Sequence, residues 1–545
     1  MEIDFTKLHV LVVDDHPGMR TSIRTTLSNF GVTKTDMAST AFDAARRIRQ
    51  AEAPYELIVC DYNLGDGRDG QQLLEELRLG KLIPMSTVFL IVTAERAYEK
   101  VMSAAELAPD DYLIKPFTAE ALMQRLTKVL QKKGVFAPVY SMMDGGRVEV
   151  AIAQCDHIIA THSNYTIDAI RLKAELLLAI GHLDEGQALY EKVIAMRPVP
   201  WARMGRARAL FLLGRLAEAE QDLIALTDAA PDFLSAFDLL ARVQEARGDA
   251  GGAQATLQRA TARSPNTLAR QKVLGELALA NGQLDVAEQA FKTVVEKGTH
   301  SILRSPEDHG RLARVQIDQG KLTEAGNTLK DLRQQYHNSP EAEFTALVVE
   351  GLKETRAGHP EAAGIAVANA LKLRQEHGLA PSQGLTLDLA RACLSTGKEE
   401  EGKALLTGLI NDDHEDEQLI NKTRALFADL GRPDEGEALV QSSVRAAVAL
   451  NNEAVSLARQ GDLAGAVELL IRAATDLPNN PQILLNAAQA ILTLLKQTGW
   501  DPDKADLARR YLSRAKQRKP DHPKVAKVIG LFRDLSQKYA ATKGE

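Results

Sequence analysis

A glycine recurs along residues 181–461, and a second small residue follows each of these glycines five positions later. Self-similarity at a period of about 20 to 50 residues is typical of arrays in which neighbouring units bury one another's hydrophobic faces. The feature favours an extended array over separate globular domains for most of the 545 residues. Nine pairs occur, with 30 to 39 residues from one glycine to the next: Gly181/Gly186, Gly214/Ala219, Gly248/Ala253, Gly282/Ala287, Gly320/Ala325, Gly358/Ala363, Gly397/Gly402, Gly431/Gly436 and Gly461/Ala466.

Each unit of the array is predicted to be a pair of helices. The recurring glycine ends the first helix in the left-handed conformation, and the second small residue lets the next helix pack closely. Longer glycine spacings within residues 306–440 predict extended helices or loops there. Prolines close several units: Pro198, Pro231, Pro265 and Pro478. Small residues are expected where the two helices cross: Ala207, Ala241, Gly275, Ala313 and Ala454.

This pattern resembles the tetratricopeptide repeat, whose period is about 34 residues. The match is strongest for residues 167–300 and 447–480. The resemblance implies an all-α solenoid of about ten helix pairs over residues 149–520, with a capping helix and tail at 521–545. It also implies a long groove that binds a protein ligand, whose identity stays unknown.

Several charged residues of the first helices could face such a groove. The arginines among them suggest a preference for acidic ligands, although solvated surface charge is the simpler interpretation. The candidates are Arg203, Arg206, Arg242 and Arg311, with Asp238 and Lys272 beside them in the sequence pattern.

Residues 1–132 follow a different pattern, in which short apolar runs alternate with helical stretches. Continuous apolar strands between helices predict an α/β doubly wound domain with a five-stranded parallel sheet. Sites in such domains lie outside the carboxyl ends of the strands. The runs are Leu8–Val13, Leu57–Cys60, Thr87–Val92 and Tyr112–Ile114, with a weaker one near Thr33–Ala38.

Polar residues stand at these strand ends. Three crowded carboxylates disfavour one another's ionised form, and Mg²⁺ relieves this while it keeps several waters. Such a site suits phosphoryl transfer to Asp61, because the metal and Lys115 neutralise the charge of the phosphoryl group. In strand order the residues are Asp14 and Asp15, then Asp61, then Thr93 and Ala94, and finally Lys115.

This constellation resembles the receiver domain of two-component response regulators, with the flavodoxin-like fold and similarity to chemotaxis regulators. The resemblance implies that a sensor histidine kinase or a phosphotransfer protein phosphorylates Asp61. It implies that Mg²⁺ is held by Asp14, Asp15, Asp61 and the backbone carbonyl of Asn63.

The resemblance also implies which residues respond to phosphorylation of Asp61. Thr93, Ala94 and Lys115 would bind the phosphoryl group, and Tyr112 matches the aromatic switch residue. Asn63 and Glu95 match positions that tune the lifetime of the phosphorylated form, although solvated loop residues explain them equally well.

The loop after the third strand departs from the family pattern, and a separate segment connects the receiver to the array. Gly65 stands where the family usually has proline, so the loop after the third strand is expected to be unusual. Residues 133–148, with Pro138 and a Gly-Gly pair, predict a linker. In the family, phosphorylation shifts a face that here comprises about residues 96–106 and 112–130. An equilibrium between receiver-docked and receiver-free arrays is therefore expected.

The overall composition excludes several other classes. A net charge of -7 gives no general attraction to nucleic acid or to an anionic membrane. Three scattered cysteines and an acidic N-terminus support neither a disulfide framework nor a signal peptide, and no apolar run predicts membrane insertion. A bacterial, cytoplasmic protein is expected.

These features together predict a response regulator that acts through protein–protein interactions rather than DNA binding. It is not expected to be an enzyme, beyond its own phosphorylation and dephosphorylation. The alternative is a phosphorylation-independent tetratricopeptide scaffold with a docking receiver. The sequence leaves open whether the receiver also forms a dimer.

Overall fold

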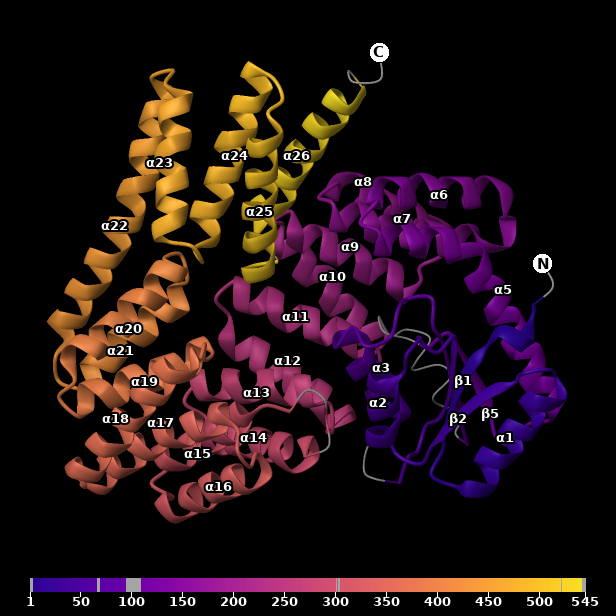
Figure 1. Cartoon of the computed structure of the whole chain (residues 1–545), viewed down its shortest axis with the longest axis horizontal. Coiled ribbons are helices and arrows are strands. Elements are labelled where there is room, and N and C mark those ends of the chain that lie inside the picture. Colours follow the sequence, from indigo (N-terminus) through magenta and orange to yellow (C-terminus); the bar gives the residue numbers. More distant parts are fainter. Residues whose placement is uncertain are drawn as a thin grey trace. The chain divides into compact units, whose positions relative to one another are not determined.

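The computed structural model divides into two units by its contacts (Figure 1). Unit 1 comprises Met1–Leu178 and Leu183–Ser305, and unit 2 comprises Ala179–His182 and Pro306–Glu545. The receiver and the first repeats thus belong to one compact unit, and the division falls inside the array. The described residues are 3–65, 69–94, 109–299, 301, 304–520 and 522–541.

The first part of unit 1 is a five-stranded parallel sheet in the order β2-β1-β3-β4-β5, as predicted. Alternate side chains of each strand point to opposite faces, so both faces need a helical cover. The strands are β1 (His9–Val13), β2 (Lys34–Ala38), β3 (Leu57–Asp61), β4 (Val88–Thr93) and β5 (Asp111–Ile114).

Four described helices cover this sheet (Figure 1). Val10, Val12 and Val59 pack on one face with residues of α1 and α5. Leu11 and Ile58 pack on the other face with residues of α2 and α3. The helices are α1 (Pro17–Asn29), α2 (Ala41–Gln50), α3 (Gly70–Leu79) and α5 (Ala119–Asp144), and a short 3₁₀ helix, η1 (Phe5–Lys7), precedes β1.

The segment predicted as a linker is largely helical. Helix α5 continues through Pro138 to Asp144 and ends at the Gly-Gly pair. Its first half packs on the sheet, whereas Phe136 and Val139 pack with Cys155 of the next helix. The apolar spacing of α5 therefore outweighs its internal proline, and one helix connects the receiver to the array.

The rest of unit 1 consists of paired helices. The elements are α6 (Val148–Thr161), the 3₁₀ helix η2 (Ser163–Tyr165), α7 (Thr166–Ala179), α8 (Leu183–Met196), α9 (Pro200–Leu212), α10 (Leu216–Ala229), α11 (Leu234–Ala246), α12 (Ala250–Arg263), α13 (Leu268–Ala280) and α14 (Leu284–Gly298).

Unit 2 continues the helical pattern to α26, in the segment that the sequence predicts to cap the array. Helices α17 and α18, of 18 residues each, account for the long spacings from Gly320 to Gly358 and from Gly358 to Gly397. The helices are α15 (Pro306–Asp318), α16 (Leu322–Gln335), α17 (Pro340–Ala357), α18 (Pro360–His377), α19 (Gln383–Ser395), α20 (Glu399–Asp412), α21 (Glu417–Asp429), α22 (Pro433–Arg459), α23 (Leu463–Asp476), α24 (Pro481–Thr498), α25 (Pro502–Arg518) and α26 (Pro523–Ala541).

Helix α22 differs from the predicted repeat. It is one continuous helix of 27 residues, where the pattern predicts the end of one helix and the start of another. No proline stands between Pro433 and Arg459, and no glycine after Gly436, so nothing ends the helix. The missing turn explains why Gly431 and Gly461 have the shortest spacing, 30 residues.

All nine recurring glycines have the predicted left-handed backbone, with φ between 72° and 90°. The small residues that follow them lie in tight helix crossings. A Cβ added at Gly186 would lie 2.7 Å from Leu178, and one at Gly436 would lie 2.7 Å from Phe427. Among the described helices, none is both long enough and apolar enough to span a lipid bilayer.

Candidate functional site

The structure brings the three predicted acidic residues together at the carboxyl ends of β1 and β3. These strands are neighbours, so Asp14 and Asp15 lie beside Asp61. One carboxylate oxygen from each lies within 4.8 Å of the others. Asp14 is buried and Asp15 is exposed, so the cluster opens to solvent on one side. An all-oxygen set with an open side fits Mg²⁺, which keeps several waters.

Lys115 links two of these carboxylates. It follows β5, and its Nζ lies 3.1 Å from Oδ2 of Asp14 and 2.9 Å from Oδ1 of Asp61. Its backbone N–H donates to the carbonyl of Thr93, which fixes the end of β5 beside β4. The Lys115–Pro116 peptide bond is cis. The lysine therefore lies where it can neutralise charge that forms on Asp61.

Burial sets the protonation properties of this cluster. It raises the pKa of Asp61 above the usual range of an aspartate, and Lys115 offsets only part of that rise. Burial alone would lower the pKa of Lys115, but the carboxylates of Asp61 and Asp14 raise it. The ammonium is thus the internal counter-ion of the site, and a bound cation would favour the ionised Asp61 further.

The loop after β3 packs directly against the acidic cluster. Gly65 has a φ of 69°, and a Cβ at this position would lie 2.6 Å from Oδ2 of Asp15. Proline fixes φ near −65°, so it could not adopt this backbone conformation. The glycine that replaces the family's usual proline is therefore explained by the course of this loop.

The same loop carries Asn63 and leads into α3. Asn63 is exposed and forms an isolated bridge with Asp69, which caps α3 together with Gln72. Residues 66–68 of the loop lie outside the described residues. The Asn63 backbone is thus held near the site from both ends of the loop.

The residues predicted to respond to phosphorylation lie at the end of β4 and in β5. Thr93 is buried at the end of β4, and Ala94 is exposed beside it. Tyr112 is buried with its ring in the apolar core, and its hydroxyl forms no hydrogen bond with the described residues. Burial raises the pKa of Tyr112. Glu95, predicted to tune the phosphoryl lifetime, lies outside the described residues.

The four arginines proposed for the groove do not form one cluster. Arg206 makes two hydrogen bonds to Asp222 of the paired helix, at 2.8 and 2.6 Å. Arg311 pairs with acidic residues of its own helix, and Arg242 lies 5.4 Å above the ring of Phe211. Arg203 is partly exposed. Most of these side chains thus have structural partners, which agrees better with surface charge than with a ligand site.

Sequence reasoning missed a tighter pair. Arg270 of α13 makes two hydrogen bonds to Asp238 of α11, at 2.7 and 2.8 Å, and its side chain is 7% exposed. The two residues stand 32 positions apart, close to one repeat period. This spacing is the feature of the sequence from which the Arg270–Asp238 pair could have been predicted.

Two histidines of the array are buried, although histidines outside a metal-binding cluster usually lie at the surface or in turns. His309 is 3% exposed, and His414 is 8% exposed with its Nδ1 2.8 Å from Nδ2 of Asn480. Burial lowers the pKa of both. Polar residues can thus be covered by another part of the array, as His414 is by Asn480 at the start of α24.

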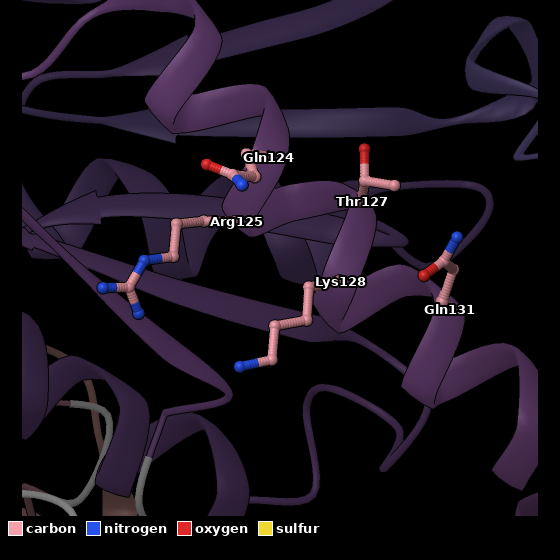
Figure 2. A pocket seen from close by; sticks show the side chains of 5 residues that line it. All are labelled: Gln124, Arg125, Thr127, Lys128 and Gln131. Carbon is pink, nitrogen blue, oxygen red and sulfur yellow. The ribbon is translucent and has the colours of Figure 1, made fainter. Parts of the chain in front are cut away.

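A surface hollow of roughly 530 Å³ lies on α5 of the receiver (Figure 2). Arg125 and Lys128 extend to the same side of the helix, and Arg125 pairs with Asp111 at 2.9 Å. The hollow belongs to the predicted responsive face, residues 112–130. Its lining residues are Gln124, Arg125, Thr127, Lys128 and Gln131.

The sheet order, the acidic cluster and the bridging lysine define a receiver domain. Residues 10–127 match the response regulator receiver domain family, and residues 171–232, 239–302 and 447–470 match tetratricopeptide repeats. Through this N-terminal domain, the chain belongs to the response regulator receiver family.

Two chemotaxis relatives agree with this assignment. The chemotaxis protein CheY of Pseudomonas aeruginosa is 30% identical over 125 residues, which cover 23% of this chain and 98% of that protein. Chemotaxis protein CheY-3 of Vibrio cholerae is 29% identical over 125 residues, which cover 23% of this chain and 93% of that protein. A tetratricopeptide repeat protein structure from Parabacteroides merdae aligns at 13% identity and a TM-score of 0.30, over 49% of this chain and 98% of that chain.

Proposed function

We propose that this protein is a phosphorelay response regulator whose Asp61 accepts a phosphoryl group from a sensor histidine kinase or a phosphotransfer protein. The observation that carries the proposal is the geometry of Lys115, whose Nζ lies 2.9 Å from Asp61 and 3.1 Å from Asp14. A nucleophilic carboxylate, a metal site and a fixed ammonium are the groups that phosphoryl transfer needs.

The residues have separate roles in this reaction. A carboxylate oxygen of Asp61 attacks the phosphorus, the phosphorus–nitrogen bond of the donor phosphohistidine breaks, and the freed imidazole takes up a proton. Lys115 neutralises charge on the phosphoryl oxygens, and Thr93 and the backbone N–H of Ala94 donate hydrogen bonds to them. Asp14, Asp15, Asp61 and the Asn63 carbonyl would hold Mg²⁺, which screens the charge of the incoming group.

The output of the protein is protein binding by the array. Repeat arrays offer extended surfaces for recognition rather than catalysis, and the net charge of -7 does not favour DNA. We therefore propose no enzymatic reaction beyond phosphorylation and dephosphorylation of Asp61, and we expect the protein to act in the cytoplasm. The described part of the responsive face, on β5 and α5, is a candidate for contacts with the kinase or with a second receiver.

Phosphorylation by acetyl phosphate in the presence of Mg²⁺ tests the acceptor. The wild-type chain should gain one phosphoryl group, detected by intact mass, and Asp61→Asn should gain none. Asp43→Asn is the matched control, because Asp43 lies on α2 and pairs with Arg46 and Arg47 away from the cluster. Equal labelling of Asp61→Asn would refute the acceptor assignment. If labelling occurs but leaves partner binding by the array unchanged, the protein is instead a phosphorylation-independent scaffold.

A further inference from the structure

The polar face of α3 is buried, although a helix that covers a sheet normally turns such a face to water. Leu73, Leu74 and Leu77 of α3 pack against the sheet. On other sides of the same helix, Gln71 is only 8% exposed and Glu76 only 5%. Something other than the sheet must therefore cover these polar side chains.

The covering element is the repeat array of the same unit. The hydroxyl of Ser301, just after α14, donates a hydrogen bond of 2.8 Å to Oε1 of Glu76, and both residues are buried. One residue earlier, Glu75 accepts a hydrogen bond from Gln71 at 3.0 Å. Burial raises the pKa of Glu75, and the hydrogen bond from Gln71 and the positive charge of Arg270 offset only part of that rise. The acidic pair of α3 thus faces groups of the array.

The charged groups of the array that act on Glu75 are Arg270 and Asp238, which join the first helices of two successive repeats. Asp238 lies on α11 and Arg270 lies on α13. Arg270 uses Nε and one terminal nitrogen for Asp238, while its other terminal nitrogen is buried without a hydrogen bond to the described residues. A buried guanidinium that is only partly satisfied favours an additional carboxylate nearby.

A short, tightly packed path connects α3 with the phosphorylation site. The N–H of Gly70, the first residue of α3, donates to the carbonyl of Tyr62 at 2.7 Å. A Cβ on Gly70 would lie 2.5 Å from the backbone oxygen of Asp61. On the other side of the loop, Gly65 lies against Asp15. The start of α3 therefore lies in direct contact with the backbone of the residue that is the predicted phosphorylation site.

We propose that α3 is an internal ligand of the array, which occupies the surface of α11 and α13 in the unphosphorylated protein and leaves it when Asp61 is phosphorylated. This inference rests on the proposed function for its trigger, but the contact itself does not. The surface that α3 vacates then binds a helix of a partner protein. That helix carries two adjacent acidic side chains, in the way that α3 carries Glu75 and Glu76. Phosphorylation then controls access to this part of the groove.

Cysteine accessibility in the full-length chain tests the proposal. The three native cysteines are buried, so a maleimide reports mainly on an introduced cysteine. We expect Ser301→Cys and Glu76→Cys to be protected from the maleimide in the unphosphorylated protein. Mg²⁺ with beryllofluoride should speed labelling of both by about tenfold, because the released state becomes dominant. Gln124→Cys, on the exposed face of α5, should label rapidly in both states.

A charge reversal separates the contact from its trigger. Adding Glu75→Lys to Ser301→Cys should expose position 301 without beryllofluoride, whereas Glu52→Lys, an equal charge change at an exposed residue, should not. Rapid labelling of Ser301→Cys in the unphosphorylated wild-type background would overturn the docking. Continued protection after beryllofluoride has bound would overturn the release. If beryllofluoride does not bind at all, the proposed function fails, yet the Glu75→Lys result still decides whether the contact exists.

Discussion

The receiver and the repeat array use charged residues in opposite ways. In the receiver, Asp14, Asp61 and Lys115 crowd into one site at a sheet edge, where each depends on the others. In the array, pairs such as Arg206–Asp222 join neighbouring helices and recur along the chain. A single substitution should therefore abolish an activity in the receiver, but in the array it should change stability near its own repeat.

Glycines show the same contrast. The nine recurring glycines of the array end helices in one common backbone conformation. Gly65 of the receiver has a similar φ, but its place beside the Asp15 carboxylate links it to one particular site. The difference teaches that the same local conformation is structural in one region and site-specific in the other, depending on its neighbours.

The largest effect is expected from Lys115→Gln. This change removes the ammonium from Asp61 and Asp14 and leaves buried carboxylates without their counter-ion. The loss of one preorganised charge-stabilising group should slow phosphorylation by acetyl phosphate about 100-fold or more. Initial rates from intact mass would measure it. Lys128→Gln on the exposed side of α5 is the control, and an equal loss in that variant would mean that the effect is not specific to the site.

A second prediction compares two glycines with the same backbone angle. Gly65 and Gly146 both have a φ of 69°, but a Cβ at Gly146 would meet nothing within 4 Å. Substitution by alanine should cost both variants about 1 to 2 kcal/mol of stability through the left-handed backbone. Only Gly65→Ala should also weaken Mg²⁺ binding, by about tenfold, because its Cβ would crowd Asp15. Calorimetric titration with Mg²⁺ measures this, and equal affinities in the two variants would contradict the assigned role of the loop.

Local chain chemistry accounts for what the sequence predicted. Left-handed glycines and strand-end carboxylates are encoded by neighbouring residues, so the glycine-terminated helix ends and the acidic cluster could be predicted from the sequence. The continuous α22 was missed because the repeat period suggested a turn, although no residue between Gly436 and Arg459 ends a helix. The helical course of α5 was missed because Pro138 suggested a break, although apolar residues continue to pack on either side of it.

Long-range contacts account for what the sequence could not predict. Glu76 resembles a residue of a solvated helix face, and only its contact with Ser301 of the array shows that it is covered. His309 and His414 are also buried polar residues of this kind. A polar residue carries no local sign that another element will bury it.

Within the array, two glycines in helices should respond in opposite directions. A Cβ at Gly275 of α13 would lie 2.6 Å from the ring of Phe291, whereas one at Gly364 of α18 would meet nothing within 4 Å. Gly364→Ala should raise the thermal midpoint, because alanine favours the helix by about 1 kcal/mol. Gly275→Ala should lower it, since overpacking costs about 1 to 3 kcal/mol. Circular dichroism measures both, and a rise in both variants would show that the helix crossing near Phe291 is loosely packed.

The smallest effect is a pH dependence that belongs to the array alone. His309 on α15 is buried, and neither ring nitrogen has a hydrogen-bond partner among the described residues. Burial lowers its pKa, although the nearby charges of Asp308 and Asp331 raise it in part. A histidine with a lowered pKa in the folded state binds its proton more readily when unfolded. Its neutral form therefore supports folding above the usual histidine pKa, and this support is lost as the pH falls below it.

His309→Leu should remove that part of the pH response. Between pH 7.5 and 5.5, the thermal midpoint of unit 2 should fall by a few degrees less in this variant than in the wild-type chain. The matched control is His337→Leu, because His337 is exposed and its replacement should leave the pH response as in the wild type. Hydrogen exchange of α15 and α16 would assign the effect to this repeat. An unchanged pH response in His309→Leu would show that no large part of the pH dependence of the array's stability comes from this one residue. The array would then differ even more from the receiver, where a few charged residues at one site determine the chemistry.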